Sequence, residues 1–259
     1  MIHKVYFADA CNVLKQHIDD ESIATVIAGP PFFVRCQTGV TGELGLLSEA
    51  DFFNELKTIF RKCKRKLVPG GKFLVQAGQI YLPKDMRTNH KVMNLCFDFY
   101  KLLSGVGLEF DGAIHYYNKH LSQRRVYLGS YPYPCSIPVP NQVEEILVFS
   151  KLGKRDVSDS PTLSSVVSKE EFKEFSKPVW EFNERVDKAA FPLGLAKRLI
   201  KFYSFKGDVI LDPFLGHGTT LIASMELDRS CIGIEINSSF ETDIRKKLGS
   251  KADEVNFVY

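Results

Sequence analysis

The sequence lacks the features that would assign it to several special classes of protein. Its six cysteines are scattered along 259 residues with no CxxC pair, which argues against a zinc site and for a reducing compartment. No apolar run approaches the roughly 18 residues of a membrane-spanning helix, and the first residues carry no signal-peptide pattern. Internal repeats are also missing. These absences predict a cytoplasmic protein.

Neither sign of charge dominates the composition. Lys and Arg number 34 against 31 Asp and Glu, which gives a net charge of +3, and 44% of the residues are hydrophobic. This balance is typical of an ordinary globular protein and is compatible with nucleic acid without requiring it. The length suits one large domain or two small ones.

The most informative stretch that is present is Asp208–Thr220, with the sequence DVILDPFLGHGTT. Val209–Leu211 predicts a buried strand, a glycine turn follows, and Thr219–Met225 predicts the start of a helix. This order presents backbone N–H groups to a ligand at the edge of a parallel sheet. A second apolar strand, Cys231–Ile234, ends at Glu235, whose carboxylate can accept hydrogen bonds from a ribose.

Strands and helices alternate along the chain, which predicts an α/β fold with a single doubly wound, Rossmann-like and mostly parallel sheet of seven strands. The expected strands are 4–8, 24–28, 72–77, 109–117, 145–150, 208–212 and 231–235. The expected helices include 11–17, one that begins after Ser48, 89–106 and one through Leu195–Tyr203. Because the glycine turn comes late, the other strands must lie upstream, and the order is expected to be circularly permuted.

A second motif, Gly29-Pro30-Pro31-Phe32, follows the expected strand 24–28. Prolines end regular structure at the carboxyl end of the strand and hold the carbonyl groups in fixed directions. The aromatic ring that follows can stack on a flat ligand. Alone, such a motif is more often a rigid structural turn; together with the glycine turn it indicates a binding site.

The two motifs resemble those of the permuted β class of amino DNA methyltransferases, and the resemblance covers nearly the whole chain. Asp212–Thr220 is similar to the family's cofactor loop, Asp-Pro-Phe-x-Gly-Ser-Gly-Thr-Thr, and Ile232–Ile236 is similar to its ribose strand. Gly29–Phe32 stands where the family has Ser/Asp/Asn-Pro-Pro-Tyr/Phe. Gly42–Gly45 and Leu67–Phe73 are similar to the branch that methylates cytosine N4.

The resemblance implies an enzyme that transfers a methyl group from S-adenosyl-L-methionine to an exocyclic amino group in double-stranded DNA, with cytosine N4 ahead of adenine N6. It implies one methyltransferase domain over residues 1–259, and no metal, since the cofactor carries the reactive group. The implied catalytic residues are Gly29, Pro30, Pro31 and Phe32. The implied cofactor-binding residues are Asp9, Ala10, Phe191, Pro192, Asp212, Pro213, Phe214, Gly216, Gly218, Thr219, Thr220, Glu235, Ile236 and Asn237.

Position 29 departs from the family pattern where the chemistry occurs. In the family, a side-chain oxygen at this position and the carbonyl of the first proline accept the two hydrogens of the target amino group. Gly29 has no side chain, and the loss of one such contact typically costs roughly 10²–10³ in rate. Either backbone carbonyls or a water fill the role, or the chain is a catalytically impaired methyltransferase fold that still binds cofactor and DNA.

Two irregular segments, 118–142 and 151–176, are candidate target-recognition loops. A base inside a duplex must be flipped out before it reacts. Lys119, Arg124 and Arg125 are candidates for phosphate contacts, with an ordinary solvated patch as the alternative.

The wider assignment also has alternatives. The resemblance implies a restriction-modification system with a cognate restriction endonuclease, and it leaves a homodimer open. An RNA or another amino compound is an alternative substrate. A nucleotide-dependent dehydrogenase is disfavoured, because Asp212 precedes the glycine turn.

Overall fold

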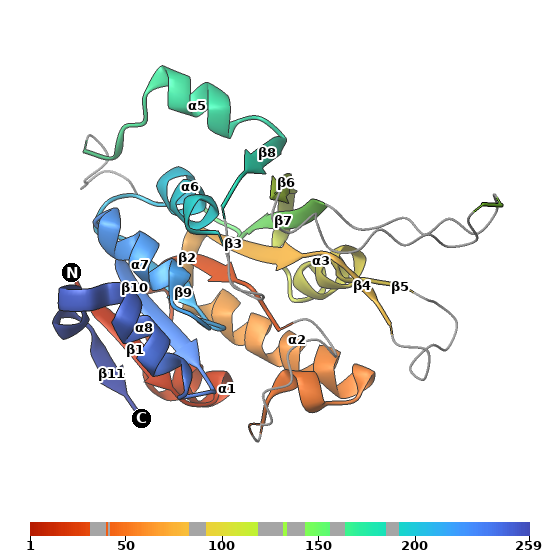
Figure 1. The fold of residues 1–259 in the computed structure, drawn as a ribbon, viewed down its shortest axis with the longest axis horizontal. Coiled ribbons are helices and arrows are strands. Elements are labelled where there is room, and N and C mark those ends of the chain that lie inside the picture. Colours follow the sequence, from red (N-terminus) through yellow and green to blue (C-terminus); the bar gives the residue numbers. More distant parts are fainter. Residues whose placement is uncertain are drawn as a thin grey trace.

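The computed structural model describes residues 1–31, 40, 42–82, 92–118, 132–133, 143–155, 164–184 and 192–259. Within these residues, nine strands form one sheet in the order β11-β1-β10-β9-β2-β3-β7-β6-β8 (Figure 1). These strands are β1 (His3–Phe7), β2 (Ile23–Ala28), β3 (Leu67–Ala77), β6 (Glu109–Asn118), β7 (Val143–Ser150), β8 (Val179–Phe182), β9 (Val209–Asp212), β10 (Ser230–Glu235) and β11 (Asn256–Val258). A separate antiparallel pair consists of β4 (Gln79–Tyr81) and β5 (Val92–Asn94).

The helices alternate with these strands, as expected for an α/β fold. They are α1 (Ala10–Gln16), α2 (Glu49–Lys66), α3 (Leu95–Gly105), α5 (Lys169–Phe175), α6 (Leu193–Tyr203), α7 (Thr219–Glu226) and α8 (Phe240–Leu248), with short 3₁₀ helices η1 (Leu44–Leu46) and η4 (Gly249–Glu254). The sheet is mostly parallel, since only β7 runs against its neighbours β3 and β6. No helix among the described residues is both long and apolar enough to cross a membrane.

All seven expected strands are present, but the sheet is larger than the expected seven. The additional strands, β8 and β11, lie at its two edges. Each is short and half-exposed, with buried residues alternating with exposed ones in β8 and none fully buried in β11. Such short edge segments give little hydrophobic signal in a sequence.

Two helix predictions are corrected by the structure. The expected helix 89–106 begins only at Leu95, because Asn94 caps it by accepting a hydrogen bond from the Cys96 N–H, and 92–94 form β5. Within the segment 151–176, predicted to be irregular, Lys169–Phe175 is a helix. A capping box between Ser168 and Glu171 begins this helix, which buries no residue and therefore lacks the apolar stripe that predicts one.

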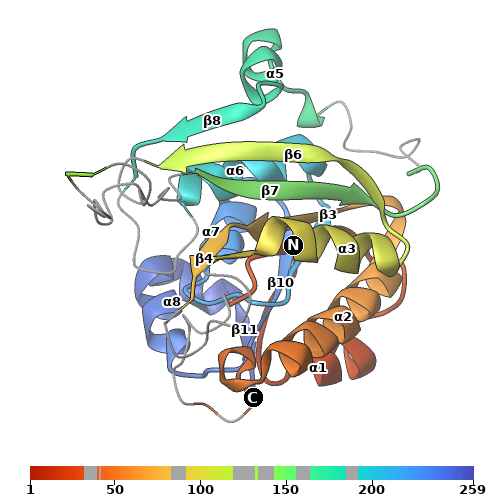
Figure 2. The ribbon, with the colours of Figure 1, turned by 90° about the vertical axis from the view of Figure 1, so that its right-hand side faces the viewer.

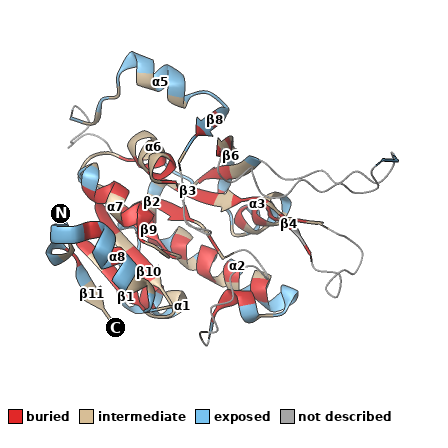
Figure 3. Ribbon diagram, in the orientation of Figure 1, coloured by how far each residue is buried: buried red, intermediate tan, exposed pale blue. Residues whose placement is uncertain are grey.

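Helices cover both faces of the sheet. Residues of α1, α2 and α3 pack on one face, and residues of α6, α7 and α8 pack on the other (Figure 2). In α2, Ser48 is the N-cap, as expected, and an apolar stripe of helical spacing that includes Phe52, Leu56 and Phe60 is buried. Figure 3 shows the buried residues concentrated in the central strands and the inner sides of these helices, while α5 is mostly exposed.

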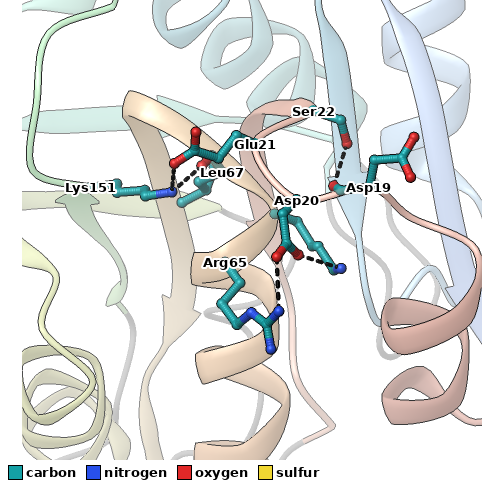
Figure 4. Close-up of polar contacts among 8 residues, drawn as sticks. Asp19, Asp20, Glu21, Ser22, Arg65, Leu67 and Lys151 are labelled. Carbon is teal, nitrogen blue, oxygen red and sulfur yellow. Dashed lines mark hydrogen bonds and ion pairs between the residues drawn. The ribbon is translucent and has the colours of Figure 1, made fainter.

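The amino-terminal edge of the sheet is held by polar contacts around the turn before β2 (Figure 4). Asp20 accepts hydrogen bonds from Arg65 at 2.8 Å and from Lys66 at 2.7 Å. Lys151 donates to Glu21 at 2.8 Å and to the Leu67 carbonyl at 2.6 Å. These contacts join the turn before β2 to the end of α2 and to the residue after β7.

The helical connections that follow β9 and β2 run in opposite directions across the sheet. The chain passes from β9 through α7 to β10 on one side, and from β2 through α2 to β3 on the other. β9 and β2 are direct neighbours, with Thr25 opposite Ile210 and Val26 opposite Leu211. Open α/β sheets bind ligands beyond the carboxyl ends of strands at such a switch point.

Candidate functional site

A cleft lies at the carboxyl ends of β2 and β9. Gly29 lines it from the end of β2, and Gln76 lines it from β3. Asp212 at the end of β9, Gly216 in the loop that follows and Thr220 at the start of α7 line it from the other side. The diproline motif and the glycine turn lie far apart in the sequence. The pairing of β2 with β9 brings the two together, as the sequence motifs suggested.

The glycine turn requires glycine at its last position. Gly218 precedes α7 with φ +78°, and a Cβ at this position would lie 3.0 Å from the Cγ1 of Ile244. Gly216 also has a positive φ, +50°. The Gly218 N–H donates to the Leu215 carbonyl at 3.0 Å, so the turn is tightly closed before the helix begins. The first N–H groups of α7 are thereby directed at the end of the loop, an arrangement that suits an anionic group.

Asp212 occupies the buried end of β9. Its carboxylate accepts hydrogen bonds from the Phe214 N–H at 3.0 Å and from the Thr220 hydroxyl. Burial is the main cause that raises the pKa of Asp212 to about 7, and the nearby Glu235 carboxylate contributes to the rise. A cationic ligand in the cleft would favour the ionised form. Asp212 is therefore suited to a ligand that carries positive charge.

Glu235, at the end of β10, holds the glycine turn. Its Oε2 accepts a hydrogen bond from the Gly216 N–H at 2.8 Å, and its Oε1 accepts one from the Asn237 N–H at 2.9 Å. Burial raises the pKa of Glu235, and the Glu43 carboxylate raises it further. Each carboxylate oxygen has a second lone pair, so both can still accept from the two hydroxyls of a ribose.

Other expected cofactor residues lie at the same edge of the sheet. Phe7, at the end of β1, pairs with Glu235, and the next segment contains Asp9 and Ala10. Asp9 is the N-cap of α1 and accepts from the Asn12 N–H at 2.9 Å. The turn at Gly42 lies against Ile236, since a Cβ on this glycine would be 3.0 Å from the Cδ1 of Ile236.

The other residues expected to bind the cofactor take part in packing, in helix ends or in hydrogen bonds with near neighbours in the sequence. Pro213 is buried, and Phe214 packs against the core that contains α1 and α2. Thr219 is the first residue of α7. The Asn237 side chain accepts from the Ser239 N–H at 3.0 Å. Pro192 is buried at the start of α6 and does not line the cleft.

Several expected site residues lie outside the described residues: Phe32, Lys119, Arg124, Arg125 and Phe191. The ends of the segment 119–142 are nevertheless defined. It leaves from Asn118 of β6 and returns at Val143 of β7, and Ala77, at the carboxyl end of β3, pairs with Glu145. The segment is therefore attached at the edge of the sheet that contains the cleft.

The described part of the segment 151–176 contacts the edge of the sheet opposite the cleft. Arg155 forms an ion pair with Asp208, which precedes β9, and Ser165 accepts from the Lys206 N–H at 2.8 Å. These contacts lie at the amino-terminal edge of the sheet, opposite the cleft.

A polar network beside the cleft has no counterpart in the sequence motifs. Gln76 Nε2 donates to the Tyr116 hydroxyl at 2.6 Å and to Glu144 Oε2 at 2.5 Å, and Tyr116 also donates to Glu144. Burial, together with Glu144, raises the pKa of Tyr116 well above its ordinary value. The three residues come from β3, β6 and β7, and only the strand register brings them together. Among the described residues, no cluster of three or more His, Cys, Asp or Glu is placed to hold a metal ion.

Comparison with known proteins gives consistent results. The family model N6_N4_Mtase, described as DNA methylase, matches residues 23–246. The type II methyltransferase M.MjaI of Methanocaldococcus jannaschii is 27% identical, with 98% of this chain and 93% of the relative aligned. M.SmaI of Serratia marcescens is 25% identical over 95% of this chain and 90% of its own length.

Solved structures share this fold. TTHA0409 of Thermus thermophilus, solved in complex with S-adenosyl-L-methionine, superimposes with a TM-score of 0.79 at 28% identity over 100% of both chains. PvuII DNA methyltransferase shares the fold, with a TM-score of 0.65 at 17% identity over 99% of this chain and 95% of that one. With the matching family model and a cleft built from the two motifs, the chain belongs to the N6/N4 family of amino DNA methyltransferases.

Proposed function

We propose that this chain transfers a methyl group from S-adenosyl-L-methionine to an exocyclic amino group of a base in double-stranded DNA, with cytosine N4 favoured over adenine N6. The observation that carries the proposal is that Gly29 and the loop from Asp212 to Thr220 line one cleft. The methyltransferase relatives and the cofactor complex of TTHA0409 support it. We further propose that residues 1–259 form one domain, because the sheet takes strands from both ends of the chain.

The residues of the cleft fit the cofactor. S-adenosyl-L-methionine supplies an electrophilic methyl group on a cationic sulfonium, together with an amino-acid group and a ribose. We assign the N–H groups of the turn that precedes α7 to the cofactor carboxylate, and Asp212 to its positive charge. We assign Glu235, whose carboxylate is already held by two backbone N–H groups, to the ribose. We assign Asp9 and Ala10 to the adenine end.

Methyl transfer also requires that the substrate amino nitrogen become more nucleophilic. An exocyclic amino nitrogen is a weak nucleophile because its lone pair is delocalised into the ring of the base. Acceptors that bind both amino hydrogens localise the lone pair and stabilise the positive charge that develops on nitrogen. The carbonyl of the buried Pro30 is one candidate acceptor, and Phe32 is the candidate stacking ring. Placement of the base against the methyl group supplies proximity.

The preference for cytosine N4 depends on two short segments. Gly42–Gly45 resembles the N4 branch, and the approach Ala28-Gly29 to the diproline is short. The structure supports a role for the first segment, because Gly42 packs against Ile236 beside the proposed ribose site. Adenine N6 is the alternative target.

Duplex DNA is the proposed partner, since the family methylates DNA and the relatives include type II methyltransferases. Those relatives also support a place in a restriction-modification system. A cognate restriction endonuclease and a homodimer stay predictions. We assign Lys119, Arg124 and Arg125 to the DNA backbone, on a segment attached at the cleft edge of the sheet.

The proposal is tested by incubating the protein with labelled S-adenosyl-L-methionine and mixed-sequence duplex DNA, followed by mass spectrometry of the nucleosides. We expect N4-methylcytosine, and no label with the Asp212→Ala variant. N6-methyladenine would support the reaction and contradict the cytosine preference. Label in RNA alone, or no methylated nucleoside with a protein that binds the cofactor, would contradict the proposed function.

A further inference from the structure

The side chain of Gln76 lines the cleft together with Gly29, where the proposed function places the substrate amino group. Val75 of β3 pairs with Ala28 of β2, so the next residues along the two parallel strands are Gln76 and Gly29. Both line the cleft. Ile27 and Leu74, two positions earlier, belong to the same buried cluster on the α6 face, and side chains alternate along a strand. Gln76 and Gly29 therefore share one face of the sheet at its carboxyl edge.

The polar network determines the orientation of the Gln76 amide. The amide nitrogen of Gln76 donates to the Glu144 carboxylate, and a flipped amide would place two acceptor oxygens against each other. The Tyr116 hydroxyl donates to Glu144 and also lies within hydrogen-bond distance of the amide nitrogen. The amide nitrogen thus faces the network, and the amide oxygen Oε1, on the other branch of the amide, is turned away from it. Within the described part of the chain, Oε1 receives no hydrogen bond.

The network also holds this orientation firmly. Tyr116 is 1% exposed, and its raised pKa keeps the hydroxyl protonated, and therefore a donor, at neutral pH. Rotation of the Gln76 amide would place its oxygen against the Glu144 carboxylate and leave the Tyr116 oxygen without a donor. Gln76 Oε1 is thus a preorganised acceptor in the wall of the cleft.

We infer that Gln76 Oε1 accepts a hydrogen bond from the target amino group, and so supplies the acceptor that Gly29 lacks. The inference rests on the proposed function. It makes Gln76 a catalytic residue, and it makes Tyr116 and Glu144 positioning residues that fix the amide. Gln76 takes no proton; it orients the amino group and stabilises the positive charge that develops on nitrogen. A glycine at position 29 then leaves room for a base held from the neighbouring strand.

The test compares single and double variants in labelled methylation of duplex DNA. Gln76→Met keeps the length of the side chain but removes the acceptor, and we expect kcat to fall about 100-fold. The affinity for S-adenosyl-L-methionine, measured by calorimetric titration, should stay within twofold. The matched control is Gln16→Met, the same change on an exposed helix position, which should leave both quantities unchanged.

The second arm restores an acceptor on the neighbouring strand. In the Gln76→Met background, Gly29→Ser should recover activity at least tenfold, while Gly29→Ser alone should leave the rate unchanged or lower it. Such non-additivity is expected when two side chains serve one role. Tyr116→Phe retains the Gln76–Glu144 bond, and it should lower kcat without changing the KM for the cofactor. This variant keeps the test decisive if Gln76→Met is unstable.

Three results would overturn the inference. Wild-type kcat in Gln76→Met would show that Oε1 contacts no substrate. Equal stimulation by Gly29→Ser in the wild-type and Gln76→Met backgrounds would show that the acceptor is simply missing. An unchanged kcat in Tyr116→Phe would show that the network does not position the amide. Failure of the proposed function is distinguishable, because then no variant, including Gly29→Ser, methylates any nucleoside.

Discussion

The Glu235 carboxylate accepts a hydrogen bond from the Gly216 N–H at 2.8 Å, across the carboxyl ends of β10 and β9. The residue assigned to the ribose therefore also holds the turn assigned to the rest of the cofactor. Leu215, in the same turn, donates from its N–H to the Ile234 carbonyl at 2.9 Å. Gly233 permits this close approach, since a Cβ there would lie 2.5 Å from the Cδ2 of Leu215. Hydrogen bonds and packing thus hold together the two parts of the proposed cofactor site.

Removal of the Glu235 carboxylate should weaken cofactor binding. We expect Glu235→Ala to lower the affinity for S-adenosyl-L-methionine at least tenfold, about 1.4 kcal/mol, because both a ribose acceptor and a support of the turn are lost. Asp212→Ala should have an effect of similar size. Calorimetric titration measures both, with Glu241→Ala, whose carboxylate pairs with Arg245 of α8, as the control. Unchanged affinity in both variants would contradict the assigned cofactor site.

The buried carboxyl of Asp212 should make stability depend on pH. Its pKa is about 7 in the folded protein against an ordinary 3.8, so between these values the folded state binds more protons than the unfolded chain. The free energy of unfolding contributed by this group therefore falls as the pH rises through that window. We expect Asp212→Asn to exceed the wild type in stability by more at pH 8 than at pH 5.

Denaturant unfolding at the two pH values measures this difference. The matched control is Asp253→Asn at an exposed position, which should show the same difference from wild type at both pH values. A pH-independent difference for Asp212→Asn would mean that Asp212 is ionised throughout. The same variant should bind the cofactor more weakly than wild type, because the negative charge is gone.

The turn at Gly218 should not tolerate a side chain. Gly218→Ala places a Cβ on a backbone with φ +78° and 3.0 Å from Ile244, so we expect the free energy of unfolding to fall by about 1–2 kcal/mol and cofactor affinity to fall with it. Gly105→Ala is the matched control. Gly105 is the last residue of α3, with no atom within 4 Å of an added Cβ, and its substitution should be neutral or mildly stabilising. If the two substitutions changed the free energy of unfolding equally, position 218 would not require glycine.

DNA binding should depend on salt through Lys119, Arg124 and Arg125. If each contacts a phosphate, replacing all three with Ala should reduce the slope of log K against log salt by about 3, since each contact releases roughly one counterion. Fluorescence anisotropy with duplex DNA at several salt concentrations measures the slope. Replacing the exposed basic residues Lys57, Arg61 and Arg65 of α2 is the matched control. Equal slopes for the two triple variants would show that Lys119, Arg124 and Arg125 do not contact the DNA backbone.

Local sequence patterns were sufficient for much of this protein. The Ser48 cap, the apolar stripe of α2 and the seven expected strands follow from residue spacing over a few positions. The glycine turn is equally local, because Gly216 and Gly218 adopt positive φ within a single loop. Where a local pattern was weak, prediction failed: α5 buries no residue, and β8 and β11 are edge strands of four and three residues with few apolar positions.

The amino-acid sequence alone therefore determined the backbone conformation of the two motifs. Each motif is a contiguous run, and its conformation depends on its own prolines and glycines. Only the tertiary structure decided that they share a cleft, because that depends on the pairing of β2 with β9. It alone also placed Gln76 beside Gly29 and against Tyr116 and Glu144. These contacts depend on the register of four strands, and a shift of one residue in any of them would turn its side chains to the opposite face of the sheet.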